Sequence, residues 1–288
     1  MNFNHIFHSL EYLKRASVMR KLWLAIALYA IPGLPVLAVT LPFTDGFEAG
    51  NFSAWNGGRT NGFSVSATSA HTGRYAAGGT SSLGIGTDYY QEAYFGDHPR
   101  ASGAPVANGL YVKFSHKFDS DFNLGTAADS HKVLLINFED SNDLRREQII
   151  LNIFGTTPIG TNRGHYMIEN IHWNVDRSFG SGQLFRQNRG TAVAYRPGEW
   201  DTIKIYIRPN TVGQTDGTVR VWINGEIKIE HTNISMRQTA YNPNLVIIGY
   251  YAPDTDIQGT RRWDDITVSE SDPDSNDTVA PSAPTRLR

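Results

Sequence analysis

The chain has 288 residues, of which 40% are hydrophobic and only 19% are charged, so it carries enough apolar side chains to bury a large core. Its formal net charge of −2 excludes the excess of lysine and arginine that a dedicated nucleic-acid-binding protein needs. The lack of cysteine excludes disulfides, thiolate zinc sites, iron–sulfur clusters and a cysteine nucleophile.

The N-terminal region predicts an export signal. Residues 19–38 read MRKLWLAIALYAIPGLPVLA, with a basic start, an apolar run, and Val36 and Ala38 as the small residues of a cleavage site. Proline and glycine interrupt the run, which disfavours a permanent membrane helix. We expect residues 1–38 to be a signal peptide, with Met19 as the true start or residues 1–18 as an extended basic region, and the protein to be secreted.

The middle of the chain predicts strands. Short runs rich in Val, Ile, Tyr, Phe and Thr alternate with Gly, Asn, Asp and Pro, and no helical stripe is visible. The clearest predicted strands span 110–118, 132–138, 148–154, 165–172, 200–208, 218–223, 227–232, 245–250 and 263–269. So many strands in one domain, residues 39–270, predict an all-β sandwich of two antiparallel sheets.

One turn and two strands are especially well marked. Asn224-Gly225 supplies the positive φ angles of a tight hairpin turn between 218–223 and 227–232. In 200–208 the isoleucines alternate with Lys204 and Tyr206, and in 218–223 the valines alternate with Trp222. Each strand therefore buries one face and leaves the other polar.

The C-terminal residues predict a linker. Residues 271–288 are rich in Ser, Asp and Pro and show no apolar periodicity. The stretch 277–287, DTVAPSAPTRL, resembles the opening strand of a fibronectin type III module. We expect further modules to follow in a longer protein.

Several motifs together resemble a known family. They are FTDGFEAGNFSAWNG from Phe43, FSVSATSAHTGRYA from Phe63, GEWDTIKIYIRPNT with DGTVRVWINGEIKIEHT, and RRWDDITVSESD near the end. This order resembles the concanavalin A-like lectin and glucanase jelly rolls, above all the laminin-G-like and heparin-lyase-like polysaccharide lyases that bacteria secrete. The resemblance implies a jelly roll that acts on or binds a polysaccharide. The same fold also hosts lectins and hydrolases, so function depends on the site.

A calcium site is implied at the domain's ends. Glu48 lies near the first strand and Asp264 and Asp265 lie in the last one, and in jelly rolls these two strands are neighbours. Carboxylate oxygens are the ligands that Ca²⁺ prefers. Parity with Ile266 and Val268 favours Asp264 as the buried carboxylate. The alternative is that these acids only cap turns.

Two other kinds of site are disfavoured. A retaining glycosidase of the laminarinase type needs Glu-x-Asp-x-x-Glu on one strand, and Glu139-Asp140 is followed by Ser-Asn-Asp instead. His131, His165 and Glu169 match no zinc spacing.

A lyase needs a group that neutralises the uronate carboxylate, a base and an acid. Arg145 and Gln148 enter one strand, Asn170-Ile171-His172 lies on the next, and Tyr250 comes late, an order that resembles an alginate-lyase pattern in which Gln stands at position 170. The resemblance implies His172 as base, Tyr250 as acid and Gln148 or Arg145 as neutraliser. The alternative is that these side chains only support the sheet.

Sugar binding needs aromatic platforms with polar neighbours. Suitable candidates on polar faces of predicted strands are Lys204, Tyr206, Asn152, Trp173 and Trp222.

Together with the resemblance, these features predict a secreted jelly roll that cleaves an acidic polysaccharide by β-elimination. A non-catalytic carbohydrate-binding module and a laminin-G-like adhesion domain are the alternatives.

Overall fold

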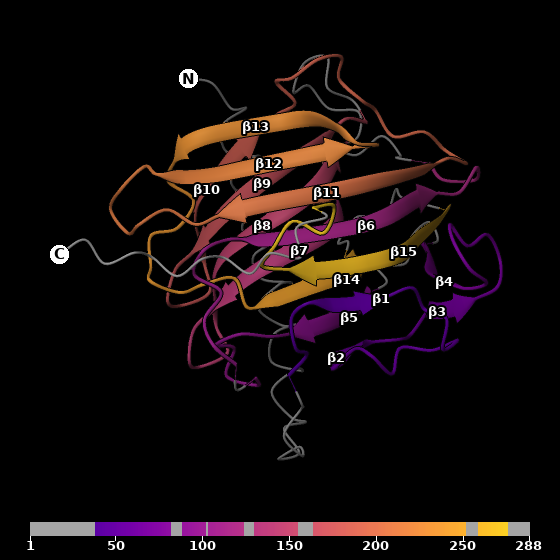
Figure 1. Ribbon diagram of the computed structural model, residues 1–288, viewed down its shortest axis with the longest axis horizontal. Helices are drawn as coiled ribbons and strands as arrows, with labels where there is room; N and C mark the ends of the chain where they lie inside the picture. Colours follow the sequence, from indigo (N-terminus) through magenta and orange to yellow (C-terminus); the bar gives the residue numbers. More distant parts are fainter. Residues whose placement is uncertain are drawn as a thin grey trace, which may run out of the picture. The chain divides into compact units, whose positions relative to one another are not determined.

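Two antiparallel sheets pack face to face in the part of the chain that the structure describes (Figure 1). This computed structural model describes residues 38–81, 88–101, 103–123, 130–154, 164–251 and 259–275. All of the named secondary-structure elements in these ranges are β-strands, so the all-β jelly-roll sandwich predicted from the sequence is confirmed. Within these ranges no helix suited to crossing a membrane is found. The predicted signal peptide lies outside them, apart from Ala38.

The first sheet has eight strands. In spatial order they are β13 (Glu226–Ile234), β12 (Gly217–Ile223), β11 (Trp200–Arg208), β6 (Leu110–Phe118), β15 (Gly259–Ser269), β4 (Ala76–Ser81) and β3 (Phe63–Ser66), with β1 (Phe43–Asp45) also paired to β15. The pairing of β1 with β15 confirms that the first and last strands are neighbours, with Phe43 opposite Val268.

The second sheet has seven strands. In spatial order they are β10 (Phe179–Phe185), β9 (Tyr166–Trp173), β8 (Arg145–Phe154), β7 (Ser130–Glu139), β14 (Leu245–Tyr251), β5 (Asp88–Tyr94) and β2 (Gly57–Arg59). In Figure 1 these strands lie behind the eight-stranded sheet.

The core lies between the sheets. Ile203, Ile205 and Ile207 of β11 are fully buried, and they belong to the same apolar cluster as Ile149 and Leu151 of β8. Burying a side chain of this size stabilises the fold by about 1.5–3 kcal/mol. Alternation along the strands therefore decides which residues remain on the two outer faces.

The hairpin between β12 and β13 turns at Asn224-Gly225, as the sequence predicts. Both residues have positive φ, 53° and 82°. The Asn224 Oδ1 also accepts a hydrogen bond from the backbone N–H of Thr202 at 2.9 Å. The turn is thereby tied to the neighbouring strand β11.

One buried titratable group stands out in the core. His116 of β6 is fully buried, and neither ring nitrogen has a hydrogen-bond partner in the described chain. Burial, with a further contribution from the Arg261 charge, holds the pKa of His116 well below its usual value. The imidazole is therefore neutral in the folded state.

Candidate functional site

Polar side chains gather on the outer face of the seven-stranded sheet, the face turned away from the core. The register of β7, β8 and β9 sets three cross-strand rows, Asn137–Gln148–Ile171, Leu135–Ile150–Glu169 and Lys132–Asn152–Met167. Residues directly opposite one another share a face. Leu135, Ile150 and Ile171 form an apolar cluster separate from the main core, which agrees with this assignment.

The Lys132–Asn152 row and the neighbouring row that carries Glu169 bring together an amide, a carboxylate and an ammonium group. The Asn152 Nδ2 donates a hydrogen bond to the Glu169 Oε2 at 2.7 Å. Burial raises the pKa of Glu169, whereas the Asn152 hydrogen bond and the Lys132 charge act in the opposite direction. Asn152 is fully buried and its Oδ1 has no partner in the described chain, so the amide keeps unused hydrogen-bonding capacity.

The first row is held by a chain of hydrogen bonds. The Gln148 Nε2 donates to the Asn137 Oδ1 at 2.8 Å, and the Asn137 Nδ2 donates to the Glu139 Oε1 at 2.9 Å. The His98 Nε2 lies 3.2 Å from the other oxygen of Glu139. This chain fixes which way the Gln148 amide points.

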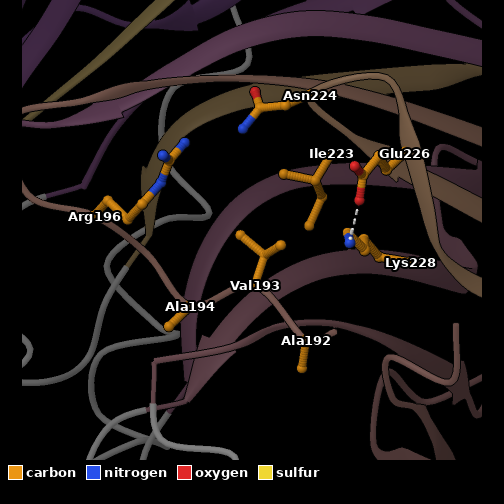
Figure 2. A pocket seen from close by; sticks show the side chains of 8 residues that line it. All are labelled: Ala192, Val193, Ala194, Arg196, Ile223, Asn224, Glu226 and Lys228. Atoms are coloured by element: carbon orange, nitrogen blue, oxygen red, sulfur yellow. Dashed lines mark hydrogen bonds and ion pairs between the residues drawn. The ribbon is translucent and has the colours of Figure 1, made fainter. Parts of the chain in front are cut away.

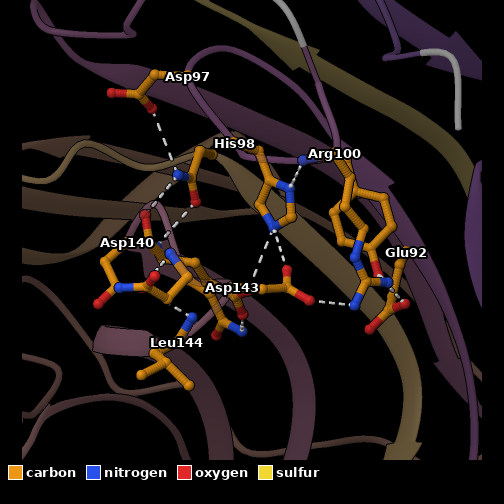
Figure 3. A network of polar contacts seen from close by, with 12 residues as sticks. Glu92, Asp97, His98, Arg100, Asp140, Asp143 and Leu144 are labelled. Atoms are coloured by element: carbon orange, nitrogen blue, oxygen red, sulfur yellow. Dashed lines mark hydrogen bonds and ion pairs between the residues drawn. The ribbon is translucent and has the colours of Figure 1, made fainter. Parts of the chain in front are cut away.

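An ion-pair network continues from Glu139 (Figure 3). Arg100 pairs with Asp143 and donates a hydrogen bond from its NH1 to the Tyr94 hydroxyl at 2.8 Å. The Tyr94 hydroxyl donates to the Glu92 Oε2 at 2.5 Å. Burial raises the pKa of Glu92 and of Tyr94, and the Glu92 charge raises that of Tyr94 further. A phenol with a raised pKa is a poor base at neutral pH.

His98, Glu139 and Asp143 place one ligand atom each within 4.8 Å of one another, which invites a test as a metal site. The backbone N–H of Arg100 donates to the His98 Nδ1 at 3.0 Å, so the neutral ring carries its proton on Nε2. That Nε2 is the atom facing the two carboxylates. A ring protonated there donates to Glu139 and does not ligate a metal, so these residues do not fit a metal site.

Two more of the residues singled out in the sequence stand near the first row. Arg145 pairs in register with Glu139, and its guanidinium lies over the Trp173 ring at 4.0 Å from the centroid. Trp173 packs against the apolar cluster of the outer face. Gln148, Arg145, Asn152 and Trp173 therefore belong to one face.

His172 lies on the opposite side of the same sheet. Its register partner is Glu147, whereas Gln148 is opposite Ile171. Desolvation lowers the pKa of His172, which the charge of Glu147 partly offsets. Its Nδ1 has no partner in the described chain. The structure does not bring His172 and Gln148 together.

Tyr250 is placed by its backbone only. It lies in β14 opposite Tyr89, and its side chain is outside the described residues. The pairing of Ile248 with Leu134 runs this end of β14 toward the end of β7 that carries Lys132. The strand end with Tyr250 and the Lys132–Asn152 row thus belong to the same end of the sheet.

The remaining three predicted sugar contacts belong to the other sheet. Lys204 and Tyr206 of β11 alternate with the buried isoleucines, so they occupy the outer face of the eight-stranded sheet. Trp222 is opposite Lys204 in register, and the Lys204 ammonium lies 4.6 Å from its ring centroid. Two sheets therefore divide the five predicted contacts, and one groove cannot hold them all.

The three predicted calcium ligands surround the loop before β4. Glu48 accepts hydrogen bonds from the backbone N–H groups of Arg74 and Tyr75, at 2.9 and 3.0 Å. Asp264 is fully buried and accepts from the N–H of His71 at 2.8 Å, and the partly exposed Asp265 contacts the His71 ring. Glu48 and Asp264 accept hydrogen bonds from backbone N–H groups in this structure, and calcium binding stays a prediction.

A pocket of about 460 Å³ opens elsewhere, beside the β12–β13 hairpin (Figure 2). Its charged lining residues are paired, Lys228 with Glu226 at 2.6 Å and Arg196 with Asp201 at 2.5 Å. None of the catalytic, sugar-binding or calcium-binding residues predicted from the sequence lines it. The pocket therefore offers no free charge for a substrate.

Sequence reasoning missed Lys132 and underrated Glu169. Both stand at alternate positions of predicted strands, Lys132 before an apolar run and Glu169 between Ile168 and Asn170. Alternation alone places neither beside Asn152, because that needs the register of three strands. A β-bulge between Lys132 and Leu134 adds a further shift.

The chain is similar to known polysaccharide lyases. A family model described as polysaccharide lyase matches residues 47–267. No curated protein matches the sequence. An endo-β-1,4-glucuronan lyase of the fungus Trichoderma reesei has 13% identity over 79% of this chain and 94% of its own, with a TM-score of 0.55. A double mutant of the alginate lyase Aly36B, in complex with an alginate trisaccharide, has 12% identity over 80% and 99%, also with a TM-score of 0.55. At these identities the solved structures show a shared fold.

Proposed function

The chain belongs to the polysaccharide lyase family and cleaves acidic polysaccharides, and we propose that cleavage takes place on the outer face of the seven-stranded sheet, around Lys132, Asn152 and Glu169. The observation that carries this proposal is the hydrogen bond between Asn152 and Glu169 at 2.7 Å, with Lys132 opposite Asn152. An amide, a cation and a carboxylate of raised pKa meet at one point of the face.

Each group has a role in β-elimination. The Lys132 ammonium binds the uronate carboxylate and neutralises it, which acidifies the neighbouring C5–H, and the buried Asn152 amide holds the Glu169 carboxylate in position. The Glu169 carboxylate accepts that proton, because a raised pKa makes it a stronger base than an ordinary glutamate. The electrons of the C5–H bond form the C4–C5 double bond while the C4–O4 bond breaks.

The departing oxygen needs a proton. We assign this role to Glu169 itself, which holds the proton taken from C5 and passes it to O4 on the same side of the sugar ring. Tyr250, the acid predicted from the sequence, lies opposite the core residue Tyr89, so its position in β14 belongs to the core-facing side of the sheet. The products are a chain with a new hydroxyl end and a chain that ends in an unsaturated uronate. His172 is the alternative base, and it requires the substrate to reach the opposite side of β9.

The first row extends the site. Gln148 lies on the same strand face as Asn152, four residues away, about 13 Å along an extended strand. Arg145 and Trp173 lie beyond it, a cation stacked on an aromatic ring. We propose that Arg145 and Trp173 bind the carboxylates and ring faces of neighbouring sugars, and that the buried Gln148 supports the face beneath them. Glucuronan and alginate, the substrates named for the two similar structures, are the first to test.

We propose that the protein acts outside the cytoplasm, because residues 19–38 have the pattern of a signal peptide. Expression of the full chain, followed by N-terminal sequencing of exported material, tests it. We expect the exported protein to begin at Val39. Full-length protein retained in the cytoplasm would contradict export.

Ultraviolet absorbance of the unsaturated product tests the reaction itself. Wild-type protein should raise the absorbance of glucuronan, alginate or heparin-type chains, and Asn152→Ala and Glu169→Gln should abolish most of the increase. Glu199→Gln is the matched control, because Glu199 is exposed and directly precedes β11 of the eight-stranded sheet in the sequence. Retention on a polysaccharide gel without any absorbance change would instead indicate a binding module.

A further inference from the structure

The outer face of the eight-stranded sheet carries a row of cations and rings that the proposed lyase site does not use. Trp222, Lys204 and Lys113 are aligned across β12, β11 and β6. In the next row, Tyr206 and Tyr111 face each other with ring centroids 4.5 Å apart. We call these five residues the back face.

An acidic stretch of the same chain lies on this face. Asp272 and Asp274 follow β15, and the stretch after this strand turns back over β6 and β11 in Figure 1. The Lys204 Nζ is 2.9 Å from a carboxylate oxygen of Asp272 and 2.9 Å from one of Asp274. The Lys113 Nζ is 2.5 Å from the other oxygen of Asp274.

In the described ranges the two lysines pair only with these two aspartates. The Lys204 side chain is only 10% exposed, so its charge depends on anions held close to it. The face is therefore an anion-binding surface whose anions are supplied here by residues 272–274.

We propose that the back face is a second binding surface for an acidic polysaccharide, and that the Asp272–Asp274 stretch competes with the polysaccharide for it. An acidic polysaccharide repeats a carboxylate and an apolar ring face at each sugar, and the back face offers two ammonium groups beside a tryptophan and a tyrosine pair. The proposal shares the substrate class of the proposed function but uses the opposite sheet.

Affinity electrophoresis in native gels that contain alginate tests this competition. All variants carry Glu169→Gln, so that the gel polymer persists. Asp272→Asn with Asp274→Asn should bind alginate about three- to tenfold more tightly than the parent, because the three ion pairs of Lys113 and Lys204 are lost. Asp176→Asn with Asp216→Asn removes the same charge from exposed loops and is the matched control.

The lysines must account for the gain. Adding Lys113→Ala and Lys204→Ala to the asparagine pair should remove it, and Lys204→Arg should restore part of it. Circular dichroism checks the fold, and Lys204→Gln replaces the alanine pair if that variant unfolds. Binding no tighter than the control, or a gain that survives loss of both lysines, would overturn the proposal.

The two proposals fail separately. Wild-type protein without lyase activity, together with a lysine-dependent gain in binding, would refute the proposed function and keep this inference. Lyase activity without such a gain would do the reverse.

Discussion

Replacing Glu169 by Gln separates its role in catalysis from its role in the fold. The carboxylate faces outward from β9 and accepts the Asn152 hydrogen bond at 2.7 Å, which a glutamine oxygen can also accept. A general base contributes about 10²–10⁴ to the rate, so kcat/KM should fall by this factor, about 3–5 kcal/mol in the activation barrier. The control Glu199→Gln should leave it unchanged.

The pH dependence follows from the direction of the pKa shift. Burial raises the pKa of Glu169 above the ordinary value of 4.5, and a base must be ionised to accept a proton. The acid limb of kcat/KM in the wild type should therefore lie above pH 4.5, and activity should rise as pH increases through it. The residual activity of the Gln variant should lack this limb.

Stability should change in the opposite sense. Because the folded state raises this pKa, it binds the proton more tightly than the unfolded chain does, and the stabilisation present below pH 4.5 is lost as pH rises through the folded pKa. A neutral glutamine avoids the cost of a buried charge, so its Tm should exceed that of the wild type at pH 7 and match it at low pH. Thermal unfolding checks this. Full activity in the variant, or a lower Tm at pH 7, would refute the reasoning.

Four further predictions follow from other parts of the chain. Asn152→Ala should lower kcat/KM by about 10²-fold, because Glu169 loses the hydrogen bond that positions it, with an unchanged far-ultraviolet spectrum; activity within threefold would contradict it. Ile205→Ala should cost about 2–5 kcal/mol in urea unfolding, since Ile205 is fully buried, and a smaller loss would mean that the sheets are not closely packed there. The wild type should lose stability as pH falls below 6.5, because His116 stays neutral in the fold while the unfolded chain takes up a proton, and His116→Phe should remove part of that loss; identical pH profiles would disprove it. If calcium binds the carboxylates of the first and last strands, EDTA should lower Tm and added Ca²⁺ restore it, whereas an unchanged Tm rules the ion out.

Alternation predicts long, half-buried strands well. The predicted ranges 110–118 and 200–208 coincide with β6 and β11, because their isoleucine, valine and phenylalanine positions repeat every second residue. None of the ranges given as the clearest predicted strands covers β1 to β5 or β10. Several of them are short or rich in glycine and serine, as in AAGGTS and FGSGQLF, so they carry no apolar pattern of their own and form by pairing with neighbours.

The site was only partly predictable. Four of the predicted residues do share a face, namely Gln148, Arg145, Asn152 and Trp173. Alternation within β8 is enough to predict that Gln148 and Asn152 lie on the same side of the strand. The sequence order also suggested His172 beside them, but the face of His172 depends on the register between β8 and β9, which sets it opposite Glu147. A shift of one residue would reverse this, and no local pattern fixes it. The same limit hid the approach of Glu169 to Asn152.

The place where a sugar chain binds tests the central claim most directly. A crystal structure of Glu169→Gln with a bound acidic oligosaccharide should show a uronate carboxylate at Lys132, with C5 facing position 169 on the outer face of the seven-stranded sheet. An oligosaccharide bound at His172 on the inner side of β9, with the outer face empty, would contradict the account.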